Sequence, residues 1–405
     1  NMRTISCLCQ IKLRARTVDY PFAGGVRFAS ADPFLAQAWQ ISAATIRSAA
    51  THVYSDCCSR GNMLWVFDGC VTARAAYFTF GETAMWRRCL VLLGEAVQPD
   101  GDVFAMAPLA DSFDRLYDAS MYWVTSCLDY WRLTGDISLL REVKAAILRF
   151  LAMLSTHMTD EDLFVPPAHA WHWIDWAPVE KRPNSLPVSA LLGVAAQSAA
   201  QIGHAIRDGE LTAMARRIDR RLGRAIPRFF DPKEGAFRAW LKPRIRLPHN
   251  PQPPDWPGIP PSPAEVFNLH GNAMVCRAGY GTRSQRARAL AFLGRRCGDP
   301  RGNRYAFGPG WTELILGPLC ESGNFAAARA CLEQRYGLFI AGGAPTWGES
   351  FHGQRFNSAH GWGSSINSLI VGSMIGLRPL AAGWGRIAFM ADPALKDFLY
   401  AIGTP

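Results

Sequence analysis

The stretch DCCSRGNMLWVFD, which runs from Asp56 to Asp68, is the part of the sequence that says most about the fold and the site of this chain. It places two carboxylates, an arginine and an indole in one turn that leads into a helix. Such a cluster of charged, hydrogen-bonding and aromatic side chains suits a sugar-binding pocket. Within it, Gly61 and Asn62 follow Arg60 at a point where a chemically active group would be expected.

Apolar residues recur at three- and four-residue spacing around this stretch, which predicts helices. We expect about twelve, over 33–50, 66–80, 83–97, 115–134, 137–157, 185–206, 210–226, 264–278, 284–297, 310–322, 326–336 and 358–375. Turns centred on Gly81, Gly135, Gly279 and Gly323 join many of them in pairs, because glycine accepts the left-handed conformation that ends a helix. About six such hairpins can close into two concentric rings. We therefore predict an all-α (α/α)6 toroid of the six-hairpin glycosidase kind, with short extended segments at both ends, rather than two separate bundles.

The expected toroid spans residues 31–378. It lies between an irregular or extended segment, 1–30, and a short extended segment, 379–405, in which 384–390 can form a strand. Prolines crowd the stretch 247–263, where they block helix and remove amide donors. This stretch is predicted to be an ordered or semi-ordered loop; a linker between two domains is the alternative.

The composition is that of an ordinary soluble globular protein, with 49% hydrophobic and 19% charged residues. No run of about 18 apolar residues occurs, so no membrane span is expected. The formal net charge is +10, and arginine far outnumbers lysine. Arg216, Arg217, Arg220, Arg221 and Arg224 have a spacing that covers much of a helix circumference. This favours a solvated helix surface over a nucleic-acid site, so we expect no nucleic-acid partner.

The 11 cysteines are irregularly spaced and indicate reduced, mostly buried thiols, which favours a cytoplasmic location. The nine histidines include no His-x-x-x-His pair. A Gly-x-Ser-x-Gly elbow and a glycine-rich phosphate loop are also absent from the sequence. We therefore expect neither a metal nor a cofactor.

Three of the longer connections combine aromatic side chains with carboxylates. They are 56–68, 171–176 and 345–362. Hydrolysis of a glycosidic bond needs one group to protonate the leaving oxygen and another to activate water or attack the sugar, with aromatic side chains to hold the ring. Taken singly, each loop is compatible with a structural role, because a cluster of indoles is common in a core and a lone carboxylate is common as a surface charge or a helix cap. Longer connections gather on one face of a toroid, and three such loops together favour a sugar site.

At these residues the chain resembles the bacterial α-L-rhamnosidase family, glycoside hydrolase family 78. The pattern Asp-Cys-x-Ser-Arg-x-x-x-x-Trp-x-x-Asp is matched from Asp56 to Asp68. Further segments that look like the family are 130–136, 173–176, 346–351, 360–362 and 376–380. Together these matches span most of the chain from about residue 32 onward.

The resemblance implies an (α/α)6 catalytic domain that acts on a carbohydrate or glycosylated small molecule by an inverting mechanism. Glu349 falls on the position of the general base, and Asp56 and Asp68 are the other candidate catalytic carboxylates. The positions that hold the sugar or line its pocket are matched by Arg60, Trp65, Trp173, Asp175, His360 and Trp362. We also assign to the substrate-binding set Gly61, Asn62, Asp118, Trp176 and Trp347.

One departure from the family is chemical. The residue after the motif's arginine is the general-acid glutamate in the family, and here it is Gly61, which has no proton to donate. Four explanations stay open. Asp56 or Asp68 supplies the proton, the leaving group needs little acid help, the protein binds without turnover, or the glycine was engineered to trap a complex.

Our leading hypothesis is an α-L-rhamnosidase-like glycoside hydrolase that acts on a deoxyhexose-type glycoside. One alternative is a catalytically impaired protein that binds carbohydrates or glycosylated metabolites. Another is a lyase, transferase or tailoring enzyme on the same scaffold. The family usually carries β-sandwich domains on both sides of its helical core, and this chain has little room for them. Its pocket is then more open or is completed by a second subunit in a homo-oligomer.

Overall fold

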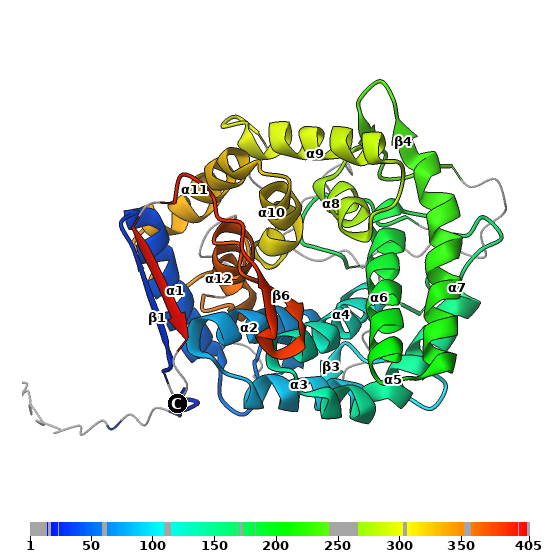
Figure 1. Cartoon of the computed structure of the whole chain (residues 1–405), viewed down its shortest axis with the longest axis horizontal. Helices are drawn as coiled ribbons and strands as arrows, with labels where there is room; N and C mark the ends of the chain where they lie inside the picture. Colours follow the sequence, from blue (N-terminus) through cyan, green and yellow to red (C-terminus); the bar gives the residue numbers. More distant parts are fainter. Residues whose placement is uncertain are drawn as a thin grey trace, which may run out of the picture.

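Twelve α-helices form two concentric rings in the part of the chain that the computed structural model describes (Figure 1). The described residues are 14, 18–22, 24–58, 63–108, 115–167, 169–170, 173–182, 184–242, 266–302, 306–351, 358–395 and 397–402. The expected loop at 247–263 lies outside them. The helices alternate along the sequence between the outer and the inner ring, which confirms the predicted (α/α)6 toroid.

The inner ring is closed, because each helix packs on the next and the last packs on the first. Its members are α2 (Val66–Phe80), α4 (Tyr117–Thr134), α6 (Leu186–Ala205), α8 (Leu269–Ala278), α10 (Thr312–Glu321) and α12 (Ser365–Leu369), which a π-helical turn (Ile370–Met374) extends. Most residues of these helices are buried on every side, as expected for helices surrounded by others. By length and composition alone α6 could cross a membrane, but most of it is buried within the rings.

The outer ring consists of amphipathic helices that each bury one face. They are α1 (Pro33–Ala49), α3 (Ala84–Glu95), α5 (Ile137–Thr156), α7 (Gly209–Ala225), α9 (Arg283–Gly298) and α11 (Phe325–Ala341). Burial of that apolar face against the inner ring removes it from water and supplies the main stabilising free energy of the fold.

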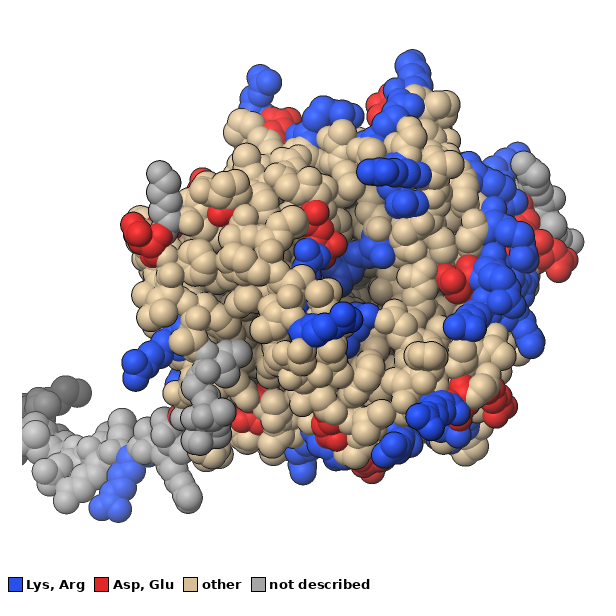
Figure 2. All heavy atoms as spheres, in the orientation of Figure 1, with Lys and Arg blue, Asp and Glu red and all other residues tan. Residues whose placement is uncertain are grey.

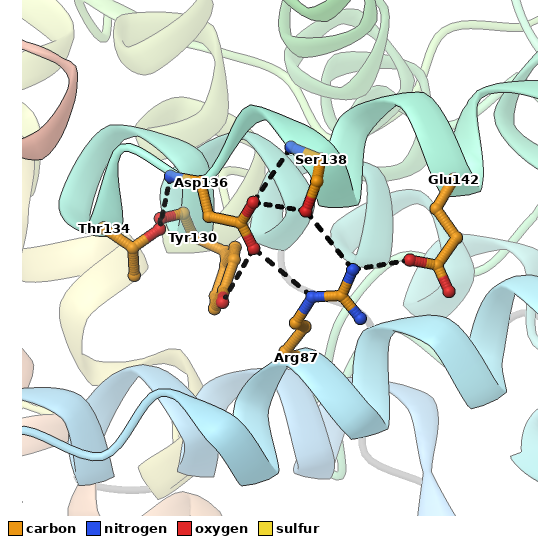
Figure 3. A network of polar contacts seen from close by, with 6 residues as sticks. All are labelled: Arg87, Tyr130, Thr134, Asp136, Ser138 and Glu142. Carbon is orange, nitrogen blue, oxygen red and sulfur yellow. Dashed lines mark hydrogen bonds and ion pairs between the residues drawn. The ribbon is translucent and has the colours of Figure 1, made fainter.

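The turn between α4 and α5 shows how a hairpin closes (Figure 3). Gly135 ends α4 in the left-handed conformation at φ 79°, and Asp136 caps α5 by accepting the Ser138 N–H at 2.9 Å. Arg87 from α3 donates to Asp136 at 3.3 Å and to Glu142 at 2.6 Å. The sequence signals for the turn are thus confirmed, and the same aspartate ties the hairpin to the preceding helix.

Short antiparallel strand pairs complete the fold. β1 (Val26–Ser30) pairs with β8 (Phe398–Ile402), and β6 (Arg378–Ala381) pairs with β7 (Arg386–Ala388). These strands confirm the extended segments expected at both ends. Two shorter pairs lie in connections, β2 (Leu64–Trp65) with β3 (Met106–Ala107) and β4 (Phe230–Asp231) with β5 (Ala236–Phe237).

Some predicted boundaries were wrong. The last helix begins at Ser365 rather than at 358, because Ser358 bridges to Gly348 and Gly361–Ser364 forms a 3-10 turn. The helix expected over 326–336 continues to Ala341. The strand expected over 384–390 is limited to Arg386–Ala388, since Ala382–Trp384 is a 3-10 turn.

Candidate active site

Two segments about 300 residues apart in sequence meet at the end of the inner ring where α2 begins. Cys57 and His360 form an antiparallel bridge. The Gly361 N–H donates to the Asp56 carbonyl at 3.0 Å, and the His360 N–H donates to the Trp347 carbonyl at 2.9 Å. Backbone hydrogen bonds therefore hold the early acidic stretch against the late loop that contains Glu349.

Asp68 projects from the first turn of α2 and contacts this junction. Its carboxylate lies 3.6 Å from Nε2 of His360, and both side chains are buried. A carboxylate near a helix N-terminus is favoured by the partial positive charge of the helix end. The pair brings an acid and an imidazole, two groups able to exchange a proton, to the same point.

Glu349, in the late loop that contributes His360 to this junction, is also buried, at 7% exposure. Its backbone carbonyl accepts the Trp362 indole N–H at 3.1 Å, and the rings of Trp362 and His360 lie 4.2 Å apart. These contacts place the Glu349 backbone and the side chains of His360 and Asp68 at one end of the inner ring.

Aromatic rings pack beside these polar residues. Trp173 stacks on Trp362 with centroids 5.5 Å apart and planes at 19°. Phe67 contacts both indoles, at 5.4 Å and 6.1 Å, and Trp176 meets Trp173 edge-on at 5.9 Å. Trp176 is half-buried, whereas the other three rings are at most 4% exposed. Of these four rings only Trp176 keeps exposed surface that a sugar ring could contact, and the other three form a packed aromatic cluster beside it.

The loop that carries Trp173 is held by Asp118, in the first turn of α4. This carboxylate accepts the N–H groups of Ala119, at 2.9 Å, and of Ile174. Ile174 has a left-handed backbone at φ 53°, a conformation that costs free energy in a β-branched residue. Burial raises the pKa of Asp118 to about 6, and these N–H donors oppose the rise. At 1% exposure, Asp118 is placed to position the loop rather than to touch a ligand.

Asp175 joins this loop to the turn before α10. It accepts His270 Nε2 at 2.8 Å, the Gly308 N–H at 2.7 Å and the Trp176 N–H at 2.7 Å. A Cβ on Gly308 would lie 2.6 Å from Asp175 Oδ1, so the close approach requires glycine. Asp175 is 2% exposed and acts as a bridge between two loops.

Two further predicted residues have different surroundings. Trp347 is fully buried, where its indole N–H donates to Ser42 Oγ at 2.8 Å and its backbone N–H donates to Thr45 Oγ1 at 2.8 Å. It was expected to bind substrate, but this environment is that of an anchor that fixes the late loop to α1. Trp65 is half-buried in β2, directly before α2.

Sequence reasoning missed three residues next to these loops: His270, Gly308 and Lys181. Lys181 is half-buried and interacts electrostatically with Asp175 and Asp118. Burial lowers its pKa, and the two carboxylates act in the opposite direction. No local sequence pattern marks these three, because each becomes part of the site through contacts far away in sequence.

The predicted substrate-binding residues Arg60, Gly61 and Asn62, as well as 171–172, lie outside the described residues. Among the described ones, no group of three or more His, Cys, Asp or Glu side chains is arranged to hold a metal ion. The nine cysteines that the structure describes are free thiols, seven of them buried.

A closed double ring of helices, with carboxylates and indoles gathered where the inner helices begin, defines the class of six-hairpin glycosidase domains. The family described as the bacterial alpha-L-rhamnosidase 6 hairpin glycosidase domain matches residues 25–292, more than half of the chain. The chain belongs to this family.

Solved structures support the same fold. A glycoside hydrolase family 78 rhamnosidase of Bacillus sp. GL1 superposes with a TM-score of 0.80 at 21% identity, over 95% of this chain and 39% of that one. A Klebsiella oxytoca rhamnosidase with rhamnose bound has a TM-score of 0.69 at 20% identity, over 86% of this chain and 66% of that one. A Thermus thermophilus mannosylglycerate hydrolase of family 63 has a TM-score of 0.60 at 13% identity, over 82% of this chain and 99% of that one.

This chain therefore spans about two fifths of the Bacillus rhamnosidase and just under two thirds of the Klebsiella one. At these identities the likeness shows the fold alone. No curated protein matches the chain.

Proposed function

We propose that this domain hydrolyses a deoxyhexose-type glycoside, with an α-L-rhamnoside as the reference substrate, and that it inverts the anomeric centre. The observation that carries the proposal is the junction at which backbone hydrogen bonds bring the Asp56 and Glu349 segments together beside Asp68 and His360. The half-buried Trp176, which packs on the aromatic cluster next to this junction, supplies an indole surface for the sugar ring.

In the proposed reaction, the Glu349 carboxylate accepts a proton from a water molecule whose oxygen attacks the anomeric carbon. The bond to the leaving oxygen breaks on the opposite face of the sugar, and that oxygen takes a proton from an acid. Inverting enzymes keep the two carboxyl groups about 6.5–9.5 Å apart so that the water fits between sugar and base. The family membership and the placement of Glu349 in the late loop support this assignment.

Gly61 cannot supply the proton, so another group must do so or the leaving group must depart without help. We assign the acid to Asp68, with Asp56 as the second candidate. Asp68 is supported by its position 3.6 Å from His360 Nε2, since the imidazole can return a proton to the carboxylate after each turnover.

The assignment is tested by release of the aryl group from aryl α-L-rhamnosides. Wild-type protein should turn over. A gain on the order of a hundredfold in Gly61→Glu would show that no group supplies the proton in the wild type, and would refute the assignment of the acid to Asp68. Equal rates for wild type and Glu349→Gln would refute the proposal.

Gly61 itself favours a second candidate function, a carbohydrate-binding protein that no longer catalyses. Titration calorimetry with rhamnose and rhamnosides separates the two cases. Heat of binding without product in chromatography supports the binding function, and turnover excludes it. A lyase, transferase or tailoring activity would give a product other than free rhamnose in the same chromatogram.

A further inference from the structure

The outer helix α7 (Gly209–Ala225) has one face made of arginine. Five arginines lie within nine residues, Arg216, Arg217, Arg220, Arg221 and Arg224. At 100° per residue they fall within an arc of about 140°. The opposite arc holds the buried residues Leu211, Ala215, Ile218, Leu222 and Ala225. The spacing was expected to cover much of the helix circumference; the arginines instead share one broad side, and the buried residues occupy the other.

This side is on the surface of the molecule. Figure 2 shows Lys and Arg side chains gathered over α7, along the right edge of the view. Arg216, Arg217, Arg220 and Arg224 are exposed. Positions 216, 220 and 224 repeat every four residues, so they form a row with steps of about 6 Å along the helix.

The charges on this face are only partly compensated. Asp162 pairs with Arg221 at 2.7 Å and with Arg224 at 3.0 Å. Arg216, Arg217 and Arg220 take part in none of the salt bridges or side-chain hydrogen bonds formed by the described residues. Three neighbouring guanidinium groups outside these ion pairs attract a partner that brings several negative charges in a row.

The chemistry of the face narrows the class of partner. The guanidinium group forms paired hydrogen bonds with planar carboxylates and with phosphates. None of the exposed large apolar side chains in the described residues belongs to α7, which argues against insertion into a lipid surface. No Phe, Tyr or Trp occurs in α7, so it offers no stacking platform for the bases of a single strand.

We propose that the arginine face of α7 binds a linear carboxylated polysaccharide, such as a chain of uronic acid units, and holds it on the outer ring of the domain. The choice of a polysaccharide among the polyanions rests on the proposed glycosidase function; the basic face itself does not. The site residues described above all lie on other elements, so this surface can be altered without changing the candidate active site.

The test compares two variants with the same loss of charge. In the first, Arg216, Arg217 and Arg220 are replaced by Gln, which keeps high helix propensity. In the matched control, Gln replaces three exposed arginines elsewhere, Arg283 and Arg295 on α9 and Arg386 on β7. Binding to polygalacturonate is measured by affinity electrophoresis and by biolayer interferometry at several salt concentrations, with neutral dextran, duplex DNA and phosphatidylserine vesicles as parallel probes.

We expect wild type and control to bind polygalacturonate and not dextran, with affinity falling as salt rises. The α7 variant should bind about tenfold more weakly, as three exposed ion pairs would give. The proposal is overturned if wild type does not bind, if both variants weaken equally, or if DNA or vesicles bind the face more tightly than polygalacturonate. Hydrolysis of an aryl rhamnoside, measured on the same proteins, should be unchanged. Absence of hydrolysis with intact α7-dependent binding would refute the proposed function alone.

Discussion

The two sides of the candidate active site are built differently. On the aromatic side, Asp118 and Asp175 accept hydrogen bonds from Ala119, Ile174, Trp176, His270 and Gly308, and thereby hold two loops. On the other side, the segments around Asp56 and Glu349 are joined by backbone hydrogen bonds, and Asp68 faces an imidazole. Both sides pair a carboxylate with an imidazole, at 2.8 Å for Asp175 and His270 and at 3.6 Å for Asp68 and His360. Asp175 also accepts backbone N–H groups of Gly308 and Trp176 and so fixes two loops, whereas Asp68 and His360 lie at the junction with the Glu349 loop, where the proposed reaction needs a proton donor.

The largest expected effect is on the second side. Glu349→Gln should reduce kcat for an aryl rhamnoside on the order of a thousandfold, because the amide cannot accept a proton from water. The midpoint of urea unfolding should change little. Glu95→Gln, on the exposed end of α3, is the matched control and should keep full activity. Wild-type kcat in Glu349→Gln would show that this carboxylate takes no part in proton transfer.

On the aromatic side, substitution of a carboxylate is expected to reduce the stability of the fold. Asp175→Ala leaves His270 and two backbone N–H groups without their buried acceptor, so the free energy of unfolding should fall by about 3 kcal/mol. Urea denaturation followed by tryptophan fluorescence measures this. Asp68→Ala should reduce the free energy of unfolding less than Asp175→Ala does, and should reduce kcat more. The reverse ranking of the two variants would contradict the comparison of the two sides.

The ionisation of Asp118 gives the next effect. Its folded pKa is raised from 3.8 to about 6, so the folded state holds a proton that the unfolded chain has released. The contribution is therefore fully present below pH 4 and is lost as pH rises through 6, by an amount on the order of 3 kcal/mol. Stability curves at pH 4 to 7 should show a flatter slope for Asp118→Asn than for wild type. Parallel slopes would show that Asp118 stays ionised throughout.

The smallest expected effect is that of substituting Trp347, the buried indole that fixes the late loop to α1. Trp347→Phe removes the indole N–H bonded to Ser42 and part of a buried ring, which should cost about 2 kcal/mol. Because this side chain is fully buried, KM for an aryl rhamnoside should remain within about twofold. A large rise in KM with unchanged stability would restore the substrate-binding role that the sequence suggested.

Much of the fold follows from the sequence, because the helices are long and their apolar residues recur regularly. α2 was predicted with both boundaries, and Gly81, Gly135 and Gly279 end their helices as expected. The start of α12 was missed, since tertiary bridges at Ser358 and His360 replace helix there. Four of the five arginines of α7 are solvent-exposed as expected, but the five lie on one side of the helix instead of covering much of its circumference.

The site was only partly predictable, for a different reason. The motif from Asp56 to Asp68 and the position of Glu349 are local patterns that a resemblance can identify. The roles of His270 and Gly308 depend on contacts with Asp175 across 95 and 133 positions. Trp347 had the right residue type for a pocket, but only the packing reveals that it points into the core.

The pairing of β1 with β8 has a consequence for how the protein is made. Val26 and Ile402 are register partners, so the first strand emerges from the ribosome long before its mate exists. Until translation reaches β8, β1 exposes unsatisfied backbone groups that other chains can capture. Pairing of β1 with β8 is therefore a late event between residues far apart in sequence, and we expect it to be the slowest conformational step in folding after synthesis.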